Sequence, residues 1–291
     1  MALPPDISIT VELGADLHTS ASETVLAGLM AYNAAKLPMP ESRFAVLARD
    51  VETDEVQAGI SIVLYKGEAE SFWAGWSVPE AEGGPALPAV LAFTERDLAR
   101  RGARVLRCYS RAHDDRAPYL AGGYRDTARV RDHIRGGDFV VFSKALGGEA
   151  APLPATLAFE LREPLSRPLA KYVWRQTDQR RQRRLGVPVR WASAYVRQGG
   201  AVKGGALCYA AGDDFMVDMV WLDDSLRGTG TGYAMLDAAL QAGRAMGCTR
   251  AGVETMDCQA PRFYPKLGFQ PIAHLPSDVP GMGMTFFQMR L

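Results

Sequence analysis

The feature that most constrains this chain is an internal repeat, because two copies of one sequence pattern imply two copies of one fold. Residues of the second half match residues 145 positions earlier (221 minus 76), without a gap, over about fifty residues. Tryptophan and tyrosine recur along with the commoner glycine and alanine, which argues against a chance match. The matched pairs are Trp76 and Trp221, Gly83 and Gly228, Ala89 and Ala234, Leu91 and Leu236, Gly102 and Gly247, Tyr119 and Tyr264, Gly123 and Gly268, and Ala128 and Ala273.

The length of the chain and the spacer between the repeats define the expected domains. A chain of 291 residues is long enough for two domains of ordinary size. The segment GGEAAPLPA, residues 147–155, is rich in glycine, proline and alanine, as is typical of a linker. We therefore predict a first domain at residues 1–147, a linker at 148–155 and a second domain at 156–291.

The second half shows its order of elements more clearly than the first half. Strand-like runs alternate with turn residues and with helical periodicity, which predicts an α/β fold with a mixed central sheet flanked by helices. The expected elements are a strand from residue 156, a helix ending at Gly186, strands at 189–198, 204–211 and 215–222, a helix after 230 that buries Met235, Leu236, Ala239, Leu240 and Met246 and ends at Gly247, a strand at 251–257, a short helix at 259–268, and strands from 269 and 284.

A glycine-rich turn, LRGTGTGYAML at residues 226–236, joins the strand at 215–222 to the next helix. Such a turn directs unpaired backbone N–H groups and the positive end of the helix dipole at an anion. The dinucleotide fingerprint is excluded because it requires glycine where Tyr233 stands, and the P-loop because it requires Lys-Ser/Thr where Tyr233-Ala234 follows. Two interpretations remain, a phosphate loop of another kind and a helix entry without a ligand.

Two segments together resemble the GNAT family of N-acetyltransferases. Residues 227–232, RGTGTG, resemble the R-G-x-G-x-G pyrophosphate loop of that family, and residues 260–269, APRFYPKLGF, resemble its A-x-x-x-Y-x-x-x-G-F segment. The resemblance covers residues 156–291 and extends to the first half through the repeat. It implies two tandem acyl-CoA N-acyltransferase domains, each a mixed central sheet flanked by helices.

The same resemblance implies that acetyl-CoA is the cosubstrate, and we expect no metal because the four histidines are spread too thinly for a zinc site. The main chain of the matching loop would hold the pyrophosphate of acetyl-CoA, and the pantetheine arm would lie between splayed strands, paired with the main chain of Val220 and Leu222. Where many relatives have asparagine before the second motif, this chain has Asp257, which accepts but does not donate a hydrogen bond. The loop residues implied are Arg227, Gly228, Thr229, Gly230, Thr231 and Gly232.

The first half departs from the family pattern at its own loop. The counterpart of RGTGTG is Glu82-Gly83-Gly84-Pro85-Ala86-Leu87, where a carboxylate replaces the cation, proline removes an amide and leucine fills a glycine position. Such a loop should repel a pyrophosphate. We therefore predict a degenerate first domain that helps to shape the substrate pocket of the second.

An amine acceptor needs help to lose a proton before it can attack a thioester. A lysine-like amine with a pKa near about 10.4 is neutral in roughly one molecule in 2,500 at pH 7, which corresponds to about 4.6 kcal/mol. Asp218 is one candidate base, because a period of two places it on a strand face with Met216, Val220 and Leu222; a structural role is the alternative. Glu254, on the strand at 251–257, is the second candidate.

Tyr264 matches the tyrosine that the family uses as a general acid toward the departing thiolate, and a core-packing role is the alternative. Cys258 lies near this segment, but no histidine accompanies it in the sequence, so direct transfer is favoured over an acyl-enzyme. The arginines at 180, 181, 183 and 184 are typical of a solvated helix face, with an acidic ligand or the 3'-phosphate of CoA as the alternative.

The amino-acid composition limits the classes of binding partner that we expect. Lys plus Arg and Asp plus Glu are both 33, so a net charge of zero gives no reason to expect nucleic-acid or membrane-surface binding. Four cysteines without a C-x-x-C pair and the absence of long apolar runs favour a cytoplasmic protein with reduced thiols. We predict a small-molecule or peptide amine as acceptor and a monomer or homodimer; the alternative function is a non-catalytic CoA-binding sensor or regulatory module.

Overall fold

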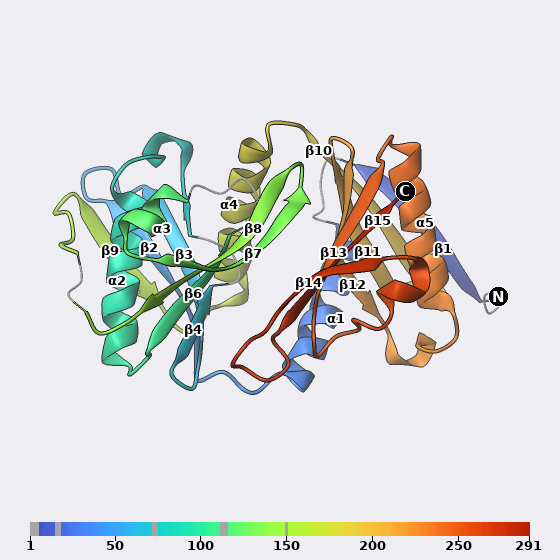
Figure 1. The fold of residues 1–291 in the computed structure, drawn as a ribbon, viewed down its shortest axis with the longest axis horizontal. Helices are drawn as coiled ribbons and strands as arrows, with labels where there is room; N and C mark the ends of the chain where they lie inside the picture. The colour runs from blue at the N-terminus through green and yellow to red at the C-terminus, as the bar shows by residue number, and fades with distance from the viewer. Residues whose placement is uncertain (1–5, 15–18, 72–74, 111–115, 149–150) are drawn as a thin grey trace. The chain divides into compact units, whose positions relative to one another are not determined.

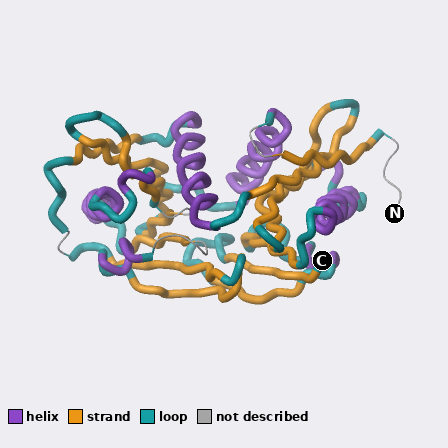
Figure 2. The backbone as a smooth tube through the Cα atoms, turned by 90° about the horizontal axis from the view of Figure 1, so that it is seen from above, coloured by secondary structure: helices purple, strands orange, loops and turns teal. Residues whose placement is uncertain are grey.

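The computed structural model describes residues 6–14, 19–71, 75–110, 116–148 and 151–291, and these form two compact units. Unit 1 contains residues 1–38 and 187–291, and unit 2 contains residues 39–186. In each unit the strands form a central sheet with helices packed against it (Figure 1, Figure 2). The α/β architecture with a mixed sheet is therefore confirmed for both.

Unit 1 carries a seven-stranded sheet in the order β1-β10-β11-β12-β13-β15-β14. The only parallel neighbours in this order are β12 and β13, and the other pairs are antiparallel. Helix α1 packs on β11 and β12, and helix α5 packs on β10 and β11. The elements are β1 (Ile7–Gly14), α1 (Ser20–Lys36), β10 (Val189–Gln198), β11 (Ala201–Ala211), β12 (Asp214–Leu222), α5 (Thr231–Ala245), β13 (Arg250–Met256), β14 (Gln270–Leu275) and β15 (Met284–Arg290), with short 3-10 turns η2 (Asp224–Leu226) and η3 (Tyr264–Leu267).

Unit 2 repeats this design with the order β7-β8-β6-β4-β3-β2-β9. Strand β5 continues the line of β4 and pairs with β3, so β4 and β5 together correspond to β12. The elements are β2 (Ser42–Asp50), β3 (Val56–Tyr65), β4 (Glu68–Ser71), β5 (Trp76–Ser77), η1 (Pro79–Ala81), α2 (Ala86–Arg100), β6 (Val105–Ser110), α3 (Ala117–Ala121), β7 (Arg125–Ile134), β8 (Gly137–Ala145), β9 (Leu157–Arg162) and α4 (Arg167–Leu185).

The two halves of the chain exchange their opening strand and helix. Strand β1 pairs with β10 from Ile7–Gln198 to Gly14–Trp191, and β9 pairs with β2 from Ala45–Arg162 to Asp50–Leu157. The compact units therefore divide after Pro38 and after Gly186, whereas the sequence led us to expect boundaries near residues 147 and 156. The physical reason is pairing: each first strand completes the sheet of the other half.

The expected strands and long helices of the second half are found with small shifts at their ends, whereas the short helix expected at 259–268 is only the 3-10 turn η3 at Tyr264–Leu267. Helix α5 buries Met235, Leu236, Ala239 and Leu240 and leaves Met246 partly exposed, and Gly247 follows it with φ +86°. The expected turn at 199–204 is shorter, because β11 begins at Ala201. One core cluster lies between α5 and the sheet of unit 1, and it includes Phe215, Val217 and Tyr264.

Candidate active site

The glycine loop of unit 1 connects β12 to α5 through the turn η2. Asp223 caps η2, since its carboxylate accepts hydrogen bonds from the N–H and hydroxyl of Ser225, and these bonds lower the pKa of Asp223. Gly228 takes φ +76° with open space where a Cβ would project, and Gly230 takes φ +88°. Both conformations favour glycine.

Two threonines stabilise the loop from within. The Thr229 hydroxyl donates to the carbonyl of Leu226 at 2.7 Å and lies 2.8 Å from the hydroxyl of Thr231. The N–H groups of Gly228, Thr229 and Gly230 donate to no acceptor among the residues that the structure describes. The loop therefore presents backbone donors at the N-terminus of α5, an arrangement suited to an anion.

Arg227 is held at the start of this loop by three groups. Its guanidinium donates twice to the carbonyl of Leu222, at 3.0 and 3.1 Å, and pairs with Asp224 at 2.8 Å. It also lies 4.5 Å from the centre of the Tyr32 ring. Because the Asp224 side chain is 86% exposed, that ion pair contributes little stability, and the cation remains available beside the loop.

Strands β12 and β13 separate at the level of the predicted site. Their parallel pairing runs from Asp214–Arg250 to Val217–Val253, and residues 218–222 and 254–256, all described, have no pairing with each other. We call this separation the fork. The Asp223 N–H donates to Lys203 of β11, so strand alternation directs the main chain of Leu222 and Val220 away from β11, toward the fork. That is the direction the pantetheine prediction requires.

A β-bulge changes the environment of Asp218. The pairing of β11 with β12 moves from Leu207–Met219 to Cys208–Val217, so Asp218 is the extra residue. Val217 and Val220 consequently pack against the same core cluster, which strict alternation would forbid. Our prediction that Asp218 shares a face with both Met216 and Val220 is therefore wrong in its geometry. The bulge instead sets this half-buried carboxylate at the opening of the fork.

Glu254 lies on β13 one residue beyond the end of the pairing with β12. Its neighbours in sequence, Val253 and Thr255, are buried, and Glu254 itself is half-buried on the opposite face of the sheet. The structure thus brings both candidate bases to the fork, one from each of the two strands that form it.

Tyr264 is buried in the turn η3 with 5% of its surface exposed. It packs edge-on against Phe263 and Phe269. Burial raises the pKa of the Tyr264 phenol well above its usual range. The phenol is therefore protonated at neutral pH and able to donate a hydrogen bond.

Asp257 and Cys258 follow β13, and both are engaged within the protein. The carboxylate of Asp257 lies 3.1 and 3.2 Å from His274 Nε2. Burial raises the pKa of the Cys258 thiol, which does not favour a nucleophilic thiolate. All four cysteines are free.

Helix α1 supplies residues that sequence reasoning did not assign to this site. The Tyr32 hydroxyl donates to the carbonyl of Cys258 at 3.3 Å, and Asn33 accepts from the side chain of Gln259 at 3.0 Å. A Cβ on Gly28 would lie 2.2 Å from the Trp221 ring, so the helix packs closely on β12. Both hydrogen bonds join residues 226 positions apart, which local sequence patterns do not connect.

In unit 2 the corresponding loop begins with a carboxylate that lies close to arginines of the same unit. Glu82, at the position of Arg227, lies 3.2 Å from Arg184, 3.5 Å from Arg183 and 3.9 Å from Arg180. Arg180 is buried, so the interpretation of these arginines as a solvated helix face is wrong for it. The helix α4 turns them toward Glu82.

The position of the fork is also filled in unit 2. Gly75 corresponds to Val220 (220 minus 145), and its N–H donates to the Tyr119 hydroxyl at 2.6 Å while its carbonyl accepts from Arg180 at 3.3 Å. A Cβ on Gly75 would lie 2.6 Å from the side chain of Leu87, which stands where the other half has Gly232. Both main-chain groups of Gly75 are therefore engaged internally.

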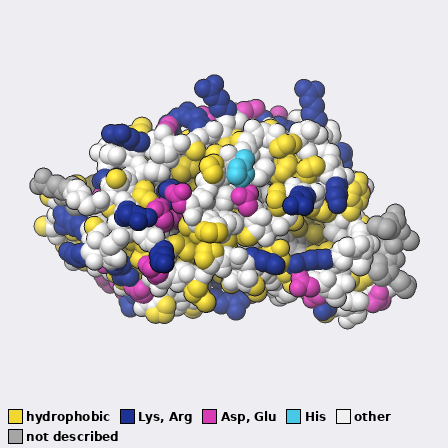
Figure 3. All heavy atoms as spheres, turned by 60° about the horizontal axis from the view of Figure 1, so that its bottom comes forward, with side chains coloured by type: hydrophobic (Ala, Val, Ile, Leu, Met, Phe, Trp, Pro, Cys, Tyr) yellow, Lys and Arg dark blue, Asp and Glu magenta, His cyan; other side chains and the backbone are white. Residues whose placement is uncertain are grey.

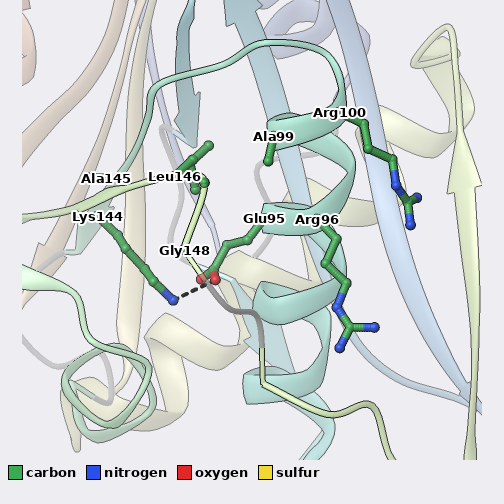
Figure 4. Close-up of a pocket in the computed structure, with 9 residues that line it drawn as sticks. Glu95, Arg96, Ala99, Arg100, Lys144, Ala145, Leu146 and Gly148 are labelled. Atoms are coloured by element: carbon green, nitrogen blue, oxygen red, sulfur yellow. Dashed lines mark hydrogen bonds and ion pairs between the residues drawn. The ribbon is translucent and has the colours of Figure 1, made fainter.

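A hollow in unit 2 lies along the C-terminal part of α2, remote from the loop that opens this helix, and the 2.6 Å ion pair between Lys144 and Glu95 crosses it while Arg96 and Arg100 extend away (Figure 4). On the face shown in Figure 3, basic and acidic side chains are scattered among uncharged ones. None of the described helices has the length and hydropathy of a membrane span.

Comparison with known proteins agrees with the loop geometry. Residues 157–269 match the model of the acetyltransferase (GNAT) family. A blasticidin-S acetyltransferase of Streptomyces morookaense is 34% identical over 84 residues, which are 28% of this chain and 62% of that relative. An acetyltransferase of Agrobacterium fabrum is 25% identical over 131 residues, 45% of this chain and 91% of that protein. A crystal structure of an acetyltransferase from Bacillus cereus aligns with a TM-score of 0.36 at 25% identity, over 43% of this chain and 94% of that one. On the family model and the two sequence relatives, this part of the chain is therefore similar to GNAT acetyltransferases.

Proposed function

We propose that this protein is an acetyl-CoA-dependent N-acetyltransferase that moves the acetyl group directly to an amine of a small molecule or peptide. The single observation that carries the proposal is the loop after β12, where backbone donors and the Arg227 cation meet at the N-terminus of α5. A diphosphate fits this arrangement because its charge complements both the cation and the helix dipole.

Each residue at or near the fork has a separate role in the proposed reaction. Main-chain groups of Val220 and Leu222 would orient the pantetheine, although the Leu222 carbonyl already accepts from Arg227 and leaves its N–H for this role. Asp218 or Glu254 would accept the proton of the amine, directly or through water. Tyr264 would donate a hydrogen bond to the departing thiolate, a role that its raised pKa permits at neutral pH.

Asp257 contributes less than the resemblance suggests. Its carboxylate is directed at His274, so we propose that it holds the segment after β13 in place rather than binding the cosubstrate. Unit 2 is proposed as a degenerate domain, since Glu82, Leu87 and the Tyr119 hydroxyl fill the positions that a thioester carrier would need.

Two measurements test the proposed function. Titration calorimetry with acetyl-CoA should give one site per chain, and thiol release should then depend on an added amine. A panel of acceptors should include blasticidin S, because the relative from Streptomyces morookaense carries that name. Binding without release on any amine would favour the sensor or regulatory module, and no binding at millimolar acetyl-CoA would refute both.

A further inference from the structure

The ring of Tyr32, near the C-terminal end of α1, lies against the cation that opens the glycine loop. Its centre is 4.5 Å from Arg227 Cζ, a distance typical of a cation–π contact. The Lys36 ammonium, one turn further along α1, is 5.9 Å from the same ring centre, so Arg227 is the closer of the two cations. The hydroxyl at the other end of the ring donates to the carbonyl of Cys258. Tyr32 therefore contacts both the loop after β12 and the segment after β13.

The other contacts of Arg227 fix one edge of its guanidinium and leave the outer end accessible. Nε and Nη2 both donate to the carbonyl of Leu222, which orients that edge toward the end of β12. Nη1 faces Asp224, whose side chain is 86% exposed. An anionic ligand can replace so exposed a partner at small cost, because surface ion pairs contribute little. The Nη1 end of the guanidinium is therefore the part that can meet a diphosphate.

We propose that Tyr32 is a positioning residue for the cosubstrate, because its ring covers the Arg227 guanidinium and holds the Nη1 end beside the glycine loop. This inference rests on the proposed function, in which Arg227 serves the diphosphate of acetyl-CoA. Without the ring, the arginine side chain gains conformational freedom that binding must remove again, so affinity falls. Helix α1 comes from the N-terminal half of the sequence, so the exchanged helix contributes to the cosubstrate site of the other half.

The binding test compares Tyr32→Leu, which removes the ring, with Tyr32→Phe, which keeps it. Calorimetry should give a Kd for acetyl-CoA about two- to fivefold higher in Tyr32→Leu, as expected for the loss of a partly exposed cation–π contact, and within about 1.5-fold of wild type in Tyr32→Phe. Met30→Leu is the control on the same helix, since the Met30 side chain is 52% exposed. Equal Kd values for Tyr32→Leu and wild type would overturn the inference, and so would an equal loss in both Tyr32 variants.

A shorter thioester separates positioning of the cation from a general structural role. S-acetylpantetheine has the acyl arm of acetyl-CoA but lacks the diphosphate. With an amine acceptor identified in the panel, Tyr32→Leu should leave kcat/KM for this thioester within about 1.5-fold of wild type. A similar loss of kcat/KM for both thioesters would indicate a distorted fork and contradict the positioning role.

A double substitution and a ligand-free measurement test the contact between the two side chains. In an Arg227→Gln background, Tyr32→Leu should raise the Kd for acetyl-CoA no further, whereas effects that multiply would overturn the inference. The Nε–Hε resonance of Arg227, assigned through Arg227→Gln, is sensitive to the ring current of Tyr32. Tyr32→Leu should shift this resonance, and Tyr32→Phe and Met30→Leu should leave it nearly unchanged.

The outcomes distinguish this inference from the proposed function. If Arg227→Gln binds acetyl-CoA as tightly as wild type, the proposed role of the cation fails. If Arg227→Gln weakens binding while Tyr32→Leu changes neither the Kd nor the Arg227 resonance, only the positioning role of Tyr32 fails. Thermal melting identifies a variant that does not fold, and Tyr32→Met, which also lacks a ring and has an unbranched side chain suited to a helix, then replaces Tyr32→Leu.

Discussion

The loops that follow β12 and β5 occupy equivalent positions in two copies of one fold, but the residues that open them carry charges of opposite sign. In unit 1 the loop begins with the cation of Arg227, and its backbone donors remain available. In unit 2 the loop begins with Glu82, which the arginines of α4 surround. The difference shows that two copies of one scaffold can place opposite charges at equivalent loops.

The two units also differ at the position of the fork. In unit 1 the main chain of Val220 is directed toward the fork. In unit 2 the equivalent residue is Gly75, whose N–H donates to the Tyr119 hydroxyl and whose carbonyl accepts from Arg180. Tyr119 and Tyr264 are equivalent in the repeat, and the Tyr119 hydroxyl accepts the hydrogen bond from the Gly75 N–H. In unit 2 the position of the fork is therefore occupied by Tyr119 and Arg180, and the counterpart of Tyr119 in unit 1 is Tyr264, the proposed hydrogen-bond donor to the thiolate.

The largest effect should come from separating the halves at the boundary that the sequence suggests. Residues 156–291 alone lack β1 and α1, so the edge of β10 and the Trp221 face of β12 are left uncovered. We expect this fragment to be insoluble or expanded by gel filtration and to lack native near-ultraviolet circular dichroism. A matched chain that joins residues 187–291 to 1–38 through a long flexible linker contains unit 1 entire and should fold. A natively folded 156–291 monomer would contradict the exchange.

A second comparison uses the two equivalent tyrosines. Tyr264→Phe should lower turnover by one to two orders of magnitude, about 1.4 to 2.7 kcal/mol, because the thiolate loses its donor, while the KM for acetyl-CoA changes little. Tyr119→Phe removes the acceptor of the buried Gly75 N–H and should cost about 1–3 kcal/mol of stability with no effect on turnover. Steady-state kinetics and urea unfolding of both variants test the pair; equal turnover in Tyr264→Phe and wild type removes the phenol from the mechanism.

The sequence predicted the elements and the loop well because these depend on local patterns. The alternation and helical periodicity of residues 189–275 placed each strand and the helix α5 within a few residues, but not the 3-10 turns η2 and η3. The glycines with positive φ, such as Gly228 and Gly247, were readable because few other residues adopt that conformation. The family model then matched the same segment.

The exchange of β1 and β9 could not be predicted, because the two strands are equivalent elements of a repeat. Either one satisfies the hydrophobic pattern of β10 or β2, and only the three-dimensional connection selects between them. The bulge at Asp218 was hidden for a related reason: one extra residue in a pairing leaves no mark on the strand that contains it. The hydrogen bond from Gln259 to Asn33 joins residues 226 positions apart (259 minus 33), which local sequence patterns do not connect.

A third comparison changes the charge that opens each loop. Arg227→Glu places a carboxylate beside the diphosphate and should raise the KM for acetyl-CoA about tenfold or more, with less than about 1 kcal/mol of lost stability because its partner Asp224 is exposed. Glu82→Gln should leave acetyl-CoA binding unchanged and cost about 1–3 kcal/mol, discounted for the partial exposure of Glu82, since buried Arg180 loses its carboxylate. Calorimetric binding and thermal melting measure both; an unchanged KM in Arg227→Glu would show that the cation does not serve the cosubstrate.

The smallest expected effect is a loss of stability in alkaline solution, to which both units contribute. Burial raises the pKa of Cys208 and Tyr264 in unit 1 and, with the Glu70 carboxylate adding to the effect, the pKa of Tyr109 in unit 2. In the unfolded chain these groups ionise near about 8.5 for thiols and 10 for phenols, so the unfolded state binds fewer protons at higher pH and stability falls. Stability from these groups should be complete below about pH 8, and Tm should fall by several degrees between about pH 8 and 10.5. Tyr109→Phe should reduce the part of that fall above about pH 9.5, and a Tm that is flat across the whole range would show that these buried groups keep ordinary pKa values.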